Sequence, residues 1–140
     1  MTIGVIGGGA AGFFAALTAK KAFPQHTVII FEKTSKILSK VKVSGGGRCN
    51  VTNACFDNHT LAKNYPRGEN HLKKAFEQFN SLSTMEWFKT RGVALKTYPD
   101  NCVFPQSNDS QTIIDCFLNE AKILGVDIRM NQSISSILKT

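Results

Sequence analysis

A run of glycines between two apolar segments constrains the fold of this chain more than any other feature. Residues 2–6 and 27–31 are short and almost wholly apolar, as expected for buried parallel strands. Residues 10–23 are rich in Ala, Leu and Phe and stop at Pro24, which is typical of a helix that ends before a proline. A strand, a helix and a second strand within about thirty residues make one right-handed crossover unit. The sequence therefore predicts an α/β fold with a parallel sheet.

The glycines lie at the turn between the first strand and the helix and follow the spacing G-x-G-x-x-G. In this pattern Gly7 permits the tight turn, Gly9 lets the backbone approach a pyrophosphate, and Gly12 lets the helix pack closely on the strand. Glu32 ends the second strand, twenty residues after Gly12. A carboxylate there accepts ribose hydroxyls and repels a 2′-phosphate, so a dinucleotide other than NADP is expected. The alternative is an ordinary glycine-rich turn with a solvated glutamate.

A second glycine-rich segment follows at residues 44–53, Ser-Gly-Gly-Gly-Arg-Cys-Asn-Val-Thr-Asn. Three consecutive glycines cost backbone entropy, which favours a role that needs positive φ or close backbone approach. Arg48 beside them offers a planar charged fork for a phosphate or for stacking. The segment lacks the Gly-Lys-Ser/Thr ending of a P-loop. It suits the longer FAD better than NAD, and a flexible surface loop with a solvated arginine is the alternative.

Both segments together resemble a known family. The run 7–12 with Phe13, Ala15, Ala16 and Glu32, followed by Lys-Val-Ser-Gly-Gly-Gly-Arg-Cys-Asn-Val-Thr-Asn at 42–53, is similar to the bacterial BaiN-like flavoproteins. Val-Phe-Pro at 103–105 matches the family as well, and the resemblance covers essentially the whole chain. Family members are FAD-binding oxidoreductases with a two-dinucleotide-fold, glutathione-reductase-like architecture. The resemblance thus implies a Rossmann-like FAD-binding domain.

The resemblance also implies roles for individual residues. The pyrophosphate would contact the first glycine loop, the adenosine ribose would contact Glu32 and Lys33, and the backbone near Ile134 would meet the adenine. The second loop would face the pyrophosphate, the ribityl chain and the flavin. These assignments comprise Gly7, Gly9, Ala10, Ala11, Gly12, Glu32, Lys33, Ser44, Gly45, Gly46, Gly47, Arg48, Cys49, Asn50 and Ile134. No residue stands out as a catalytic acid or base, since the flavin itself carries hydride chemistry. NAD(P)H is the candidate electron donor and a small molecule the expected substrate.

Two departures from the family matter. Asn101-Cys102 stand where the family usually has Gly-Arg before Val-Phe-Pro. The chain is also much shorter than family members, so it is expected to be an N-terminal fragment whose Rossmann-like domain is incomplete at the C-terminus and inactive alone. The expected organisation is a first βαβ unit at 1–44, the glycine-rich loop with an inserted helical and short-strand segment at 45–108, and a crossover helix with a third strand at 109–140.

The remaining elements follow from periodicity and turn residues. Residues 33–65 are expected to be mostly loop, and Ser83 with Glu86 forms a candidate capping box. Trp87 is expected to be a core anchor. The predicted helices are 70–80, 83–91 and one that begins after Asn108, Asp109 or Ser110 and ends at Gly125; the predicted strands are 93–98, 102–104, 126–130 and 134–138.

The formal net charge of +7 is uneven: residues 1–70 carry nine Lys/Arg and three Asp/Glu, whereas residues 71–140 carry eight and seven. Such an excess suits a phosphate ligand, a nucleic acid, a membrane surface or a solvated lysine face. Nucleic acid is disfavoured because the lysines at 33–42 have no aromatic neighbours for base stacking. Two alternatives to the FAD oxidoreductase stay open, namely half of an NAD-dependent dehydrogenase and a non-catalytic RNA-associated module.

The four cysteines, Cys49, Cys55, Cys102 and Cys116, contain no C-x-x-C pair. The set Cys49, Cys55 and His59 lacks a fourth ligand, so no metal is expected. No apolar run approaches the ~18 residues of a membrane span, and no cleavable signal is visible. A cytoplasmic protein with reduced cysteines is predicted.

Overall fold

The computed structural model describes residues 1–139 and divides into two compact units. Unit 1 is Met1–Val43 together with the chain from Ile113 onward, and unit 2 is Ser44–Thr112. Each unit has its own sheet. Among the described residues, no helix has the length and apolar character that crossing a membrane requires.

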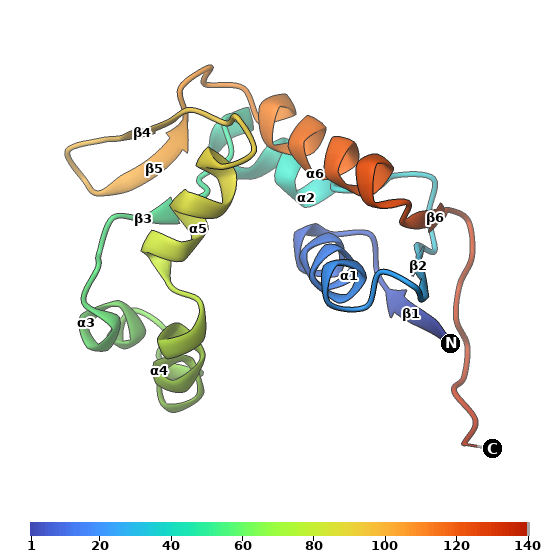
Figure 1. Cartoon of the computed structure of the whole chain (residues 1–140). Coiled ribbons are helices and arrows are strands. Elements are labelled where there is room, and N and C mark those ends of the chain that lie inside the picture. The colour runs from blue at the N-terminus through green and yellow to red at the C-terminus, as the bar shows by residue number, and fades with distance from the viewer. Residues whose placement is uncertain (140) are drawn as a thin grey trace. The chain divides into compact units, whose positions relative to one another are not determined.

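Unit 1 contains a parallel three-stranded sheet in the order β1-β2-β6. Its strands are β1 (Thr2–Ile6), β2 (Thr27–Phe31) and β6 (Asp127–Arg129). Helix α1 (Ala10–Ala22) packs on β1 and β2 (Figure 1). The aromatic rings of Phe13 in α1 and Phe117 in α6 (Gln111–Leu124) lie 5.9 Å apart. The predicted βαβ unit and third strand are therefore confirmed.

The core of unit 1 lies on β2 and on the inner faces of the helices. Its fully buried side chains include Phe13, Leu17, Val28, Ile30 and Ile113. Strand β1 differs from the expected buried strand, because its side chains alternate between exposed and half-buried and Ile6 is 58% exposed. Among the described strands β1 pairs with β2 alone, so it is an edge strand of this sheet.

Unit 2 contains an antiparallel sheet in the order β3-β5-β4 and three helices. Its strands are β3 (Thr52–Asn53), β4 (Leu95–Thr97) and β5 (Cys102–Pro105), and its helices are α3 (Asn58–Lys63), α4 (Glu69–Gln78) and α5 (Ser81–Lys89). Leu61, Phe88 and Val103 are among its buried side chains. The hairpin expected around residues 99–101 is confirmed, since β4 and β5 pair antiparallel on either side of the turn. Within the turn the Asp100 carboxylate accepts a hydrogen bond from the Cys102 amide at 3.0 Å.

Several expectations from the sequence were wrong. Residues 33–65 contain short elements that the sequence analysis did not predict, namely α2 (Ser39–Val43), the 3₁₀ turn η1 (Ser44–Gly47), β3 and α3. The segment around α2 is rich in lysine, but Leu38 and Val41 in it are buried. Residues 134–138 form no strand, and Ile137 and Leu138 are 80% and 84% exposed.

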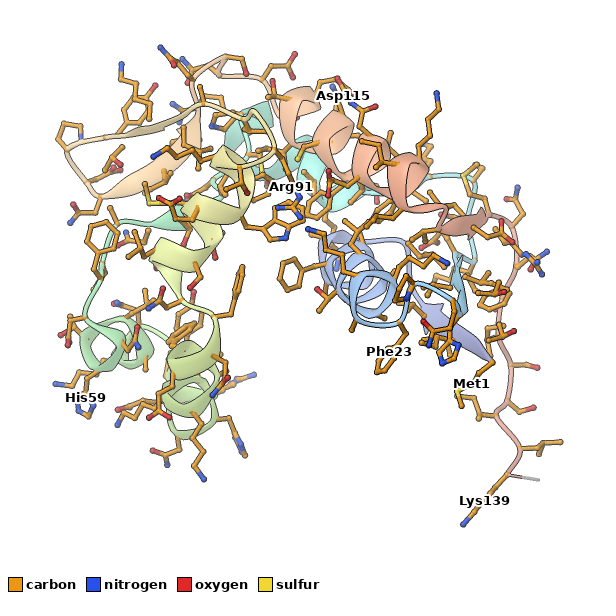
Figure 2. All side chains as sticks on the ribbon, viewed as in Figure 1. Met1, Phe23, His59, Arg91, Asp115 and Lys139 are labelled. Carbon is orange, nitrogen blue, oxygen red and sulfur yellow. The ribbon has the colours of Figure 1, made fainter. Side chains whose placement is uncertain are left out.

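Helix α5 begins earlier than predicted, and Ser83 is not its cap. The Asn80 side chain accepts a hydrogen bond from the Ser83 amide at 3.0 Å and so fills the N-cap position. Trp87 is half-buried rather than a core anchor, and the Arg91 guanidinium lies 3.8 Å from its ring centroid. Arg91, labelled in Figure 2, also donates to the Trp87 carbonyl and thereby closes the C-terminal end of α5.

Candidate functional site

The turn between β1 and α1 is built by its glycines. Gly7 has a φ of +105°, a region that side chains rarely adopt, and its amide donates to the Phe31 carbonyl at 2.8 Å. A Cβ at Gly12 would collide with the Gly7 carbonyl oxygen, which confirms that Gly12 permits close packing of helix on strand. Gly9 is the N-cap of α1, has extended backbone and has nothing within 4 Å of where its Cβ would lie. The N-terminus of α1 is therefore open, with exposed backbone at Gly9.

Glu32, at the end of β2, is tied to this turn. Its Oε2 accepts a hydrogen bond from the Gly8 amide at 2.9 Å, and its Oε1 accepts bonds from the amide and the hydroxyl of Thr34, each at 2.9 Å. The Gly8 bond, followed by the two Thr34 bonds, lowers the pKa of the Glu32 carboxyl below its ordinary value. The carboxylate is therefore ionised at neutral pH and fixed in orientation.

Gly8 is a site residue that the sequence reasoning missed. It is buried, and a Cβ there would lie 2.8 Å from Ile37 Cγ2 and 3.1 Å from Glu32 Cβ. Its carbonyl accepts a bond of 2.7 Å from the amide of Leu38, a buried residue with a φ of +53°. The G-x-G-x-x-G pattern allows any residue at its second position, which Gly8 occupies. The only sign of its role in the sequence was that residues 7–9 are all glycine.

A pocket of about 600 Å³ opens beside Glu32, between the first turn of α1 and α2. It contains three lysines and one carboxylate, and the first turn of α1 carries no acidic residue. An open helix N-terminus with this charge balance favours an anionic ligand. Phe23, at the C-terminal end of α1, is labelled in Figure 2. The pocket is lined by Gly8, Gly9, Ala10, Ala11, Glu32, Lys33, Thr34, Lys36, Ser39, Lys40 and Val41.

The pocket brings together most of the residues expected around a pyrophosphate and a ribose. Gly9, Ala10, Ala11, Glu32 and Lys33 line it, whereas Gly7 and Gly12 shape the turn behind it. Thr34, Lys36, Ser39 and Lys40 are lining residues that the sequence reasoning missed, because it treated the segment after Lys33 as loop.

The segment after β6 runs past the end of β2 in unit 1. The Asn131 amide donates to the Thr34 carbonyl at 3.0 Å, and the Gln132 amide donates to the Glu32 carbonyl at 2.9 Å. Ile134, expected near an adenine, follows two residues later and is 40% exposed. It is not among the residues that line the pocket.

The triple-glycine loop lies within unit 2 and uses its glycines in two ways. Gly45, Gly46 and Gly47 have φ of 55°, 67° and 84°, all in the left-handed region. A Cβ at Gly45 would lie 2.8 Å from both the Asn50 amide nitrogen and Phe104 Cε1, so this glycine is required by packing. Gly46 and Gly47 have nothing within 4 Å of their Cβ positions. The loop is thus folded against β5 and open at its tip.

Arg48, Cys49 and Asn50, which follow the three glycines, differ in their contacts. The Arg48 guanidinium lies 4.2 Å from the Phe104 ring centroid, and its Nε donates to the Gly45 carbonyl at 3.3 Å. Cys49 is buried, and burial raises the pKa of its thiol. The Asn50 amide is oriented so that both its oxygen and its nitrogen are satisfied, and its nitrogen then donates to the carbonyls of Thr52 at 2.8 Å and Val103 at 3.3 Å. Ser110 supports the loop, since its amide donates to the Gly47 carbonyl at 2.9 Å.

Within residues 1–139, no group of three or more His, Cys, Asp or Glu side chains could hold a metal ion. Cys49, Cys55, Cys102 and Cys116 form no disulfide in the part of the chain that the structure describes.

The strand order, the crossover helix and the glycine turn define a Rossmann-like α/β protein, as the sequence predicted. Solved structures share this fold. Thermovibrio ammonificans THI4 is 14% identical, with a TM-score of 0.58 over 92% of this chain and 38% of that one. FqzB is 18% identical, with a TM-score of 0.50 over 100% of this chain and 30% of that one.

The chain belongs to the family of the HI0933-like protein Rossmann domain, whose model matches residues 1–140. This confirms the family expected from the two glycine-rich segments, a family of flavin-binding oxidoreductases. A 3-dehydro-bile acid delta(4,6)-reductase of Clostridium scindens is 31% identical over 113 residues, which are 81% of this chain and 27% of that protein. A ribosomal RNA dihydrouridine synthase of Escherichia coli is 27% identical over 135 residues, 96% of this chain and 32% of that protein. The chain thus spans about a third or less of the length of these relatives.

Proposed function

We propose that this chain is the FAD-binding portion of a flavin-dependent oxidoreductase and that the pocket beside Glu32 holds the adenosine diphosphate half of the cofactor. The observation that carries the proposal is the Glu32 carboxylate, fixed by the Gly8 amide at 2.9 Å beside the open N-terminus of α1. A carboxylate in this place suits ribose hydroxyls, and exposed amides at a helix N-terminus suit a pyrophosphate. Family membership supports the choice of a flavin.

The residues present fit such a group. Gly9, Ala10 and Ala11 are exposed and leave room for phosphates, and the three pocket lysines add positive charge. The ionised Glu32 disfavours a 2′-phosphate, which favours FAD over NADP at this pocket. Lys33 beside the ribose and the backbone near Ile134 beside the adenine remain parts of the proposal.

When bound, FAD supplies the hydride and electron chemistry, and the protein supplies binding, orientation and electrostatics. The assignment of residues 44–50 to the pyrophosphate, ribityl and flavin side rests on the family resemblance. A ligand could approach the backbone closely at Gly46 and Gly47, where the space around the Cβ positions is open. The loop conformation is instead supported by Gly45, which is packed, and by Cys49, which is buried. NAD(P)H as electron donor and a cytoplasmic location also belong to the proposal.

Substituting Glu32 tests the adenosine site. Glu32→Ala removes a charged acceptor, so FAD affinity is expected to fall roughly tenfold or more, as for the loss of a hydrogen bond to a charged group. Glu77→Ala, which removes an exposed carboxylate from α4, is the control for net charge. Fluorescence titration with FAD and with NAD would report both affinities. Equal FAD affinity in the two variants, or NAD binding tighter than FAD binding, would rule out this assignment.

The substrate class has two candidates. A small molecule is the first, because the Clostridium scindens relative is a 3-dehydro-bile acid delta(4,6)-reductase. RNA is the second, because ribosomal RNA dihydrouridine synthases of Escherichia coli and Haemophilus influenzae match 96% and 95% of this chain. Absorbance changes of the bound flavin under NAD(P)H, with a bile-acid-type enone or with unmodified ribosomal RNA as oxidant, would separate them.

A further inference from the structure

The Glu32 carboxylate is held on both of its oxygens before any ligand is considered. Oε2 accepts one hydrogen bond, from the Gly8 amide. Oε1 accepts two, from the amide and the hydroxyl of Thr34. We call Gly8, Glu32 and Thr34 the Glu32 clasp. All three residues line the same pocket, so the clasp faces the place where a ribose is proposed to bind.

The two partners of Glu32 are fixed by further hydrogen bonds. The Lys36 amide donates to the Thr34 hydroxyl at 3.2 Å, and the Asn131 amide donates to the Thr34 carbonyl at 3.0 Å. The single proton of the Thr34 hydroxyl has two acceptors within reach, Glu32 Oε1 at 2.9 Å and the Lys36 carbonyl at 3.2 Å, and the shorter distance and the negative charge favour Oε1. On the other side, the Leu38 amide donates to the Gly8 carbonyl at 2.7 Å. Thr34 is exposed, and these hydrogen bonds connect it to Glu32, Lys36 and Asn131.

Counting acceptor positions shows what remains for a ligand. A carboxylate oxygen has about two lone pairs that accept hydrogen bonds. The two bonds from Thr34 fill Oε1, whereas the single bond from Gly8 leaves one position on Oε2. The carboxylate therefore cannot accept both hydroxyls of a ribose unless the Thr34 hydroxyl is displaced.

We propose that Thr34 is a positioning residue that occupies Oε1, so that Glu32 accepts only one of the two ribose hydroxyls, through Oε2. This inference rests on the proposed adenosine site. Glu32 would then recognise the ribose through one hydroxyl, and Thr34 would determine that the second hydroxyl is not bound by Glu32.

Deoxynucleotides test the inference on the whole chain. Calorimetric titrations would compare ADP, 2′-deoxy-ADP and 3′-deoxy-ADP as probes. Loss of the accepted hydroxyl is expected to weaken binding about tenfold or more, and loss of the other less than about twofold. Equal losses for the two deoxynucleotides would contradict the inference while leaving the proposed function intact. Absence of any ADP binding would contradict the proposed function itself.

Thr34 variants separate positioning from general stability. Thr34→Val removes the hydroxyl at similar size, so Oε1 becomes available and the difference between the two deoxynucleotides should shrink to about threefold or less. Thr34→Ser keeps a hydroxyl and should retain the difference. An unchanged difference in Thr34→Val would overturn the role of Thr34.

The clasp can also be observed without a nucleotide. The Gly8 amide proton resonance reports the ionisation of Glu32, because the two groups are hydrogen-bonded. Thr34→Val should move the midpoint of this titration to higher pH, since the hydroxyl bond contributes to the lowered pKa of Glu32, whereas Thr34→Ser should not. An identical midpoint in wild type and Thr34→Val would contradict the clasp. The charged groups around the carboxylate that stay constant in both variants are Lys33, Lys36 and Lys40 in the pocket and Asp127 and Arg129 on the adjoining β6.

Discussion

At the scale of single residues, neighbouring glycines of one motif have different physical requirements. Gly12 has no room for a Cβ, whereas Gly9 has open space and unstrained backbone. The G-x-G-x-x-G pattern predicted both roles. It could not predict Gly8, whose constraint comes from Ile37 and Glu32, residues that reach it only through the tertiary fold.

This difference gives a paired prediction. Gly12→Ala should destabilise unit 1 strongly, because its methyl group would overlap the Gly7 carbonyl oxygen. Gly9→Val should leave the free energy of unfolding within about 1 kcal/mol of wild type, since a substitution away from packed features rarely costs more. It should nevertheless abolish flavin binding if a pyrophosphate approaches this backbone. Urea unfolding and flavin content of the purified variants would be measured together. Full flavin occupancy in Gly9→Val would show that Gly9 does not line the cofactor site.

At the scale of elements, helix starts were harder to predict than helices. Ser83 with Glu86 matched a capping box, yet Asn80 fills the cap, because its side chain reaches the Ser83 amide and also bonds Asn58 at 3.1 Å. The Asn58 side chain in turn donates to the Phe76 carbonyl. A local pattern cannot reveal such links between α3, α4 and α5.

Asn80 is therefore expected to matter more than Ser83. Asn80→Ala should lower the free energy of unfolding by about 1–2 kcal/mol, the upper part of the range for a lost N-cap. Ser83→Ala keeps the amide that receives the cap and should cost less than about 0.5 kcal/mol. Chemical denaturation followed by circular dichroism would rank them. The reverse order would mean that the helix starts at the sequence-predicted capping box.

The triple-glycine loop offers a second comparison at this scale. Alanine at Gly45 or Gly46 is strained by positive φ, which costs roughly 1–2 kcal/mol. Gly45→Ala adds an overlap with Asn50 and the Phe104 ring, so it should be clearly less stable than Gly46→Ala. Thermal unfolding of both variants would measure the difference. Equal stabilities would show that the loop does not pack against β5 as described.

At the scale of the whole molecule, the sequence predicted the parallel sheet, its strand–helix–strand connection and the family. These predictions rest on apolar runs and two glycine-rich segments, in which the informative residues are close together in the sequence. The short elements between residues 39 and 63 were not predicted, since none is longer than six residues and so few buried side chains give little periodicity. The strand expected at 134–138 was wrong for the opposite reason. Its apolar residues Ile134, Ile137 and Leu138 favoured a strand, but in the structure they are exposed and belong to no strand.

The distribution of charge predicts how the whole chain responds to acid. Hydrogen bonds lower the pKa of the Glu32, Asp57, Glu69 and Asp100 carboxyls, and for Glu69 the largest cause is its bond to Lys73. A group whose pKa is lower in the folded state stabilises the fold above its unfolded value and loses that contribution as the pH falls through the folded value. The unfolded references are 4.5 for Glu and 3.8 for Asp. Stability should therefore be nearly constant from neutral pH to about 5 and decline below it.

Acid also removes negative charge from a chain that already carries +7, so repulsion adds to the decline. Urea midpoints measured across this pH range at low and high salt would separate the two causes, because salt screens repulsion between exposed charges but does not replace short hydrogen bonds. Asp57→Asn is the matched control: it removes one titrating carboxyl that caps α3 through the Thr60 amide at 2.7 Å. Its midpoint should be lower at neutral pH and should fall less steeply below about 4. A midpoint that rises as the pH drops would contradict the hydrogen-bonded state of these carboxylates.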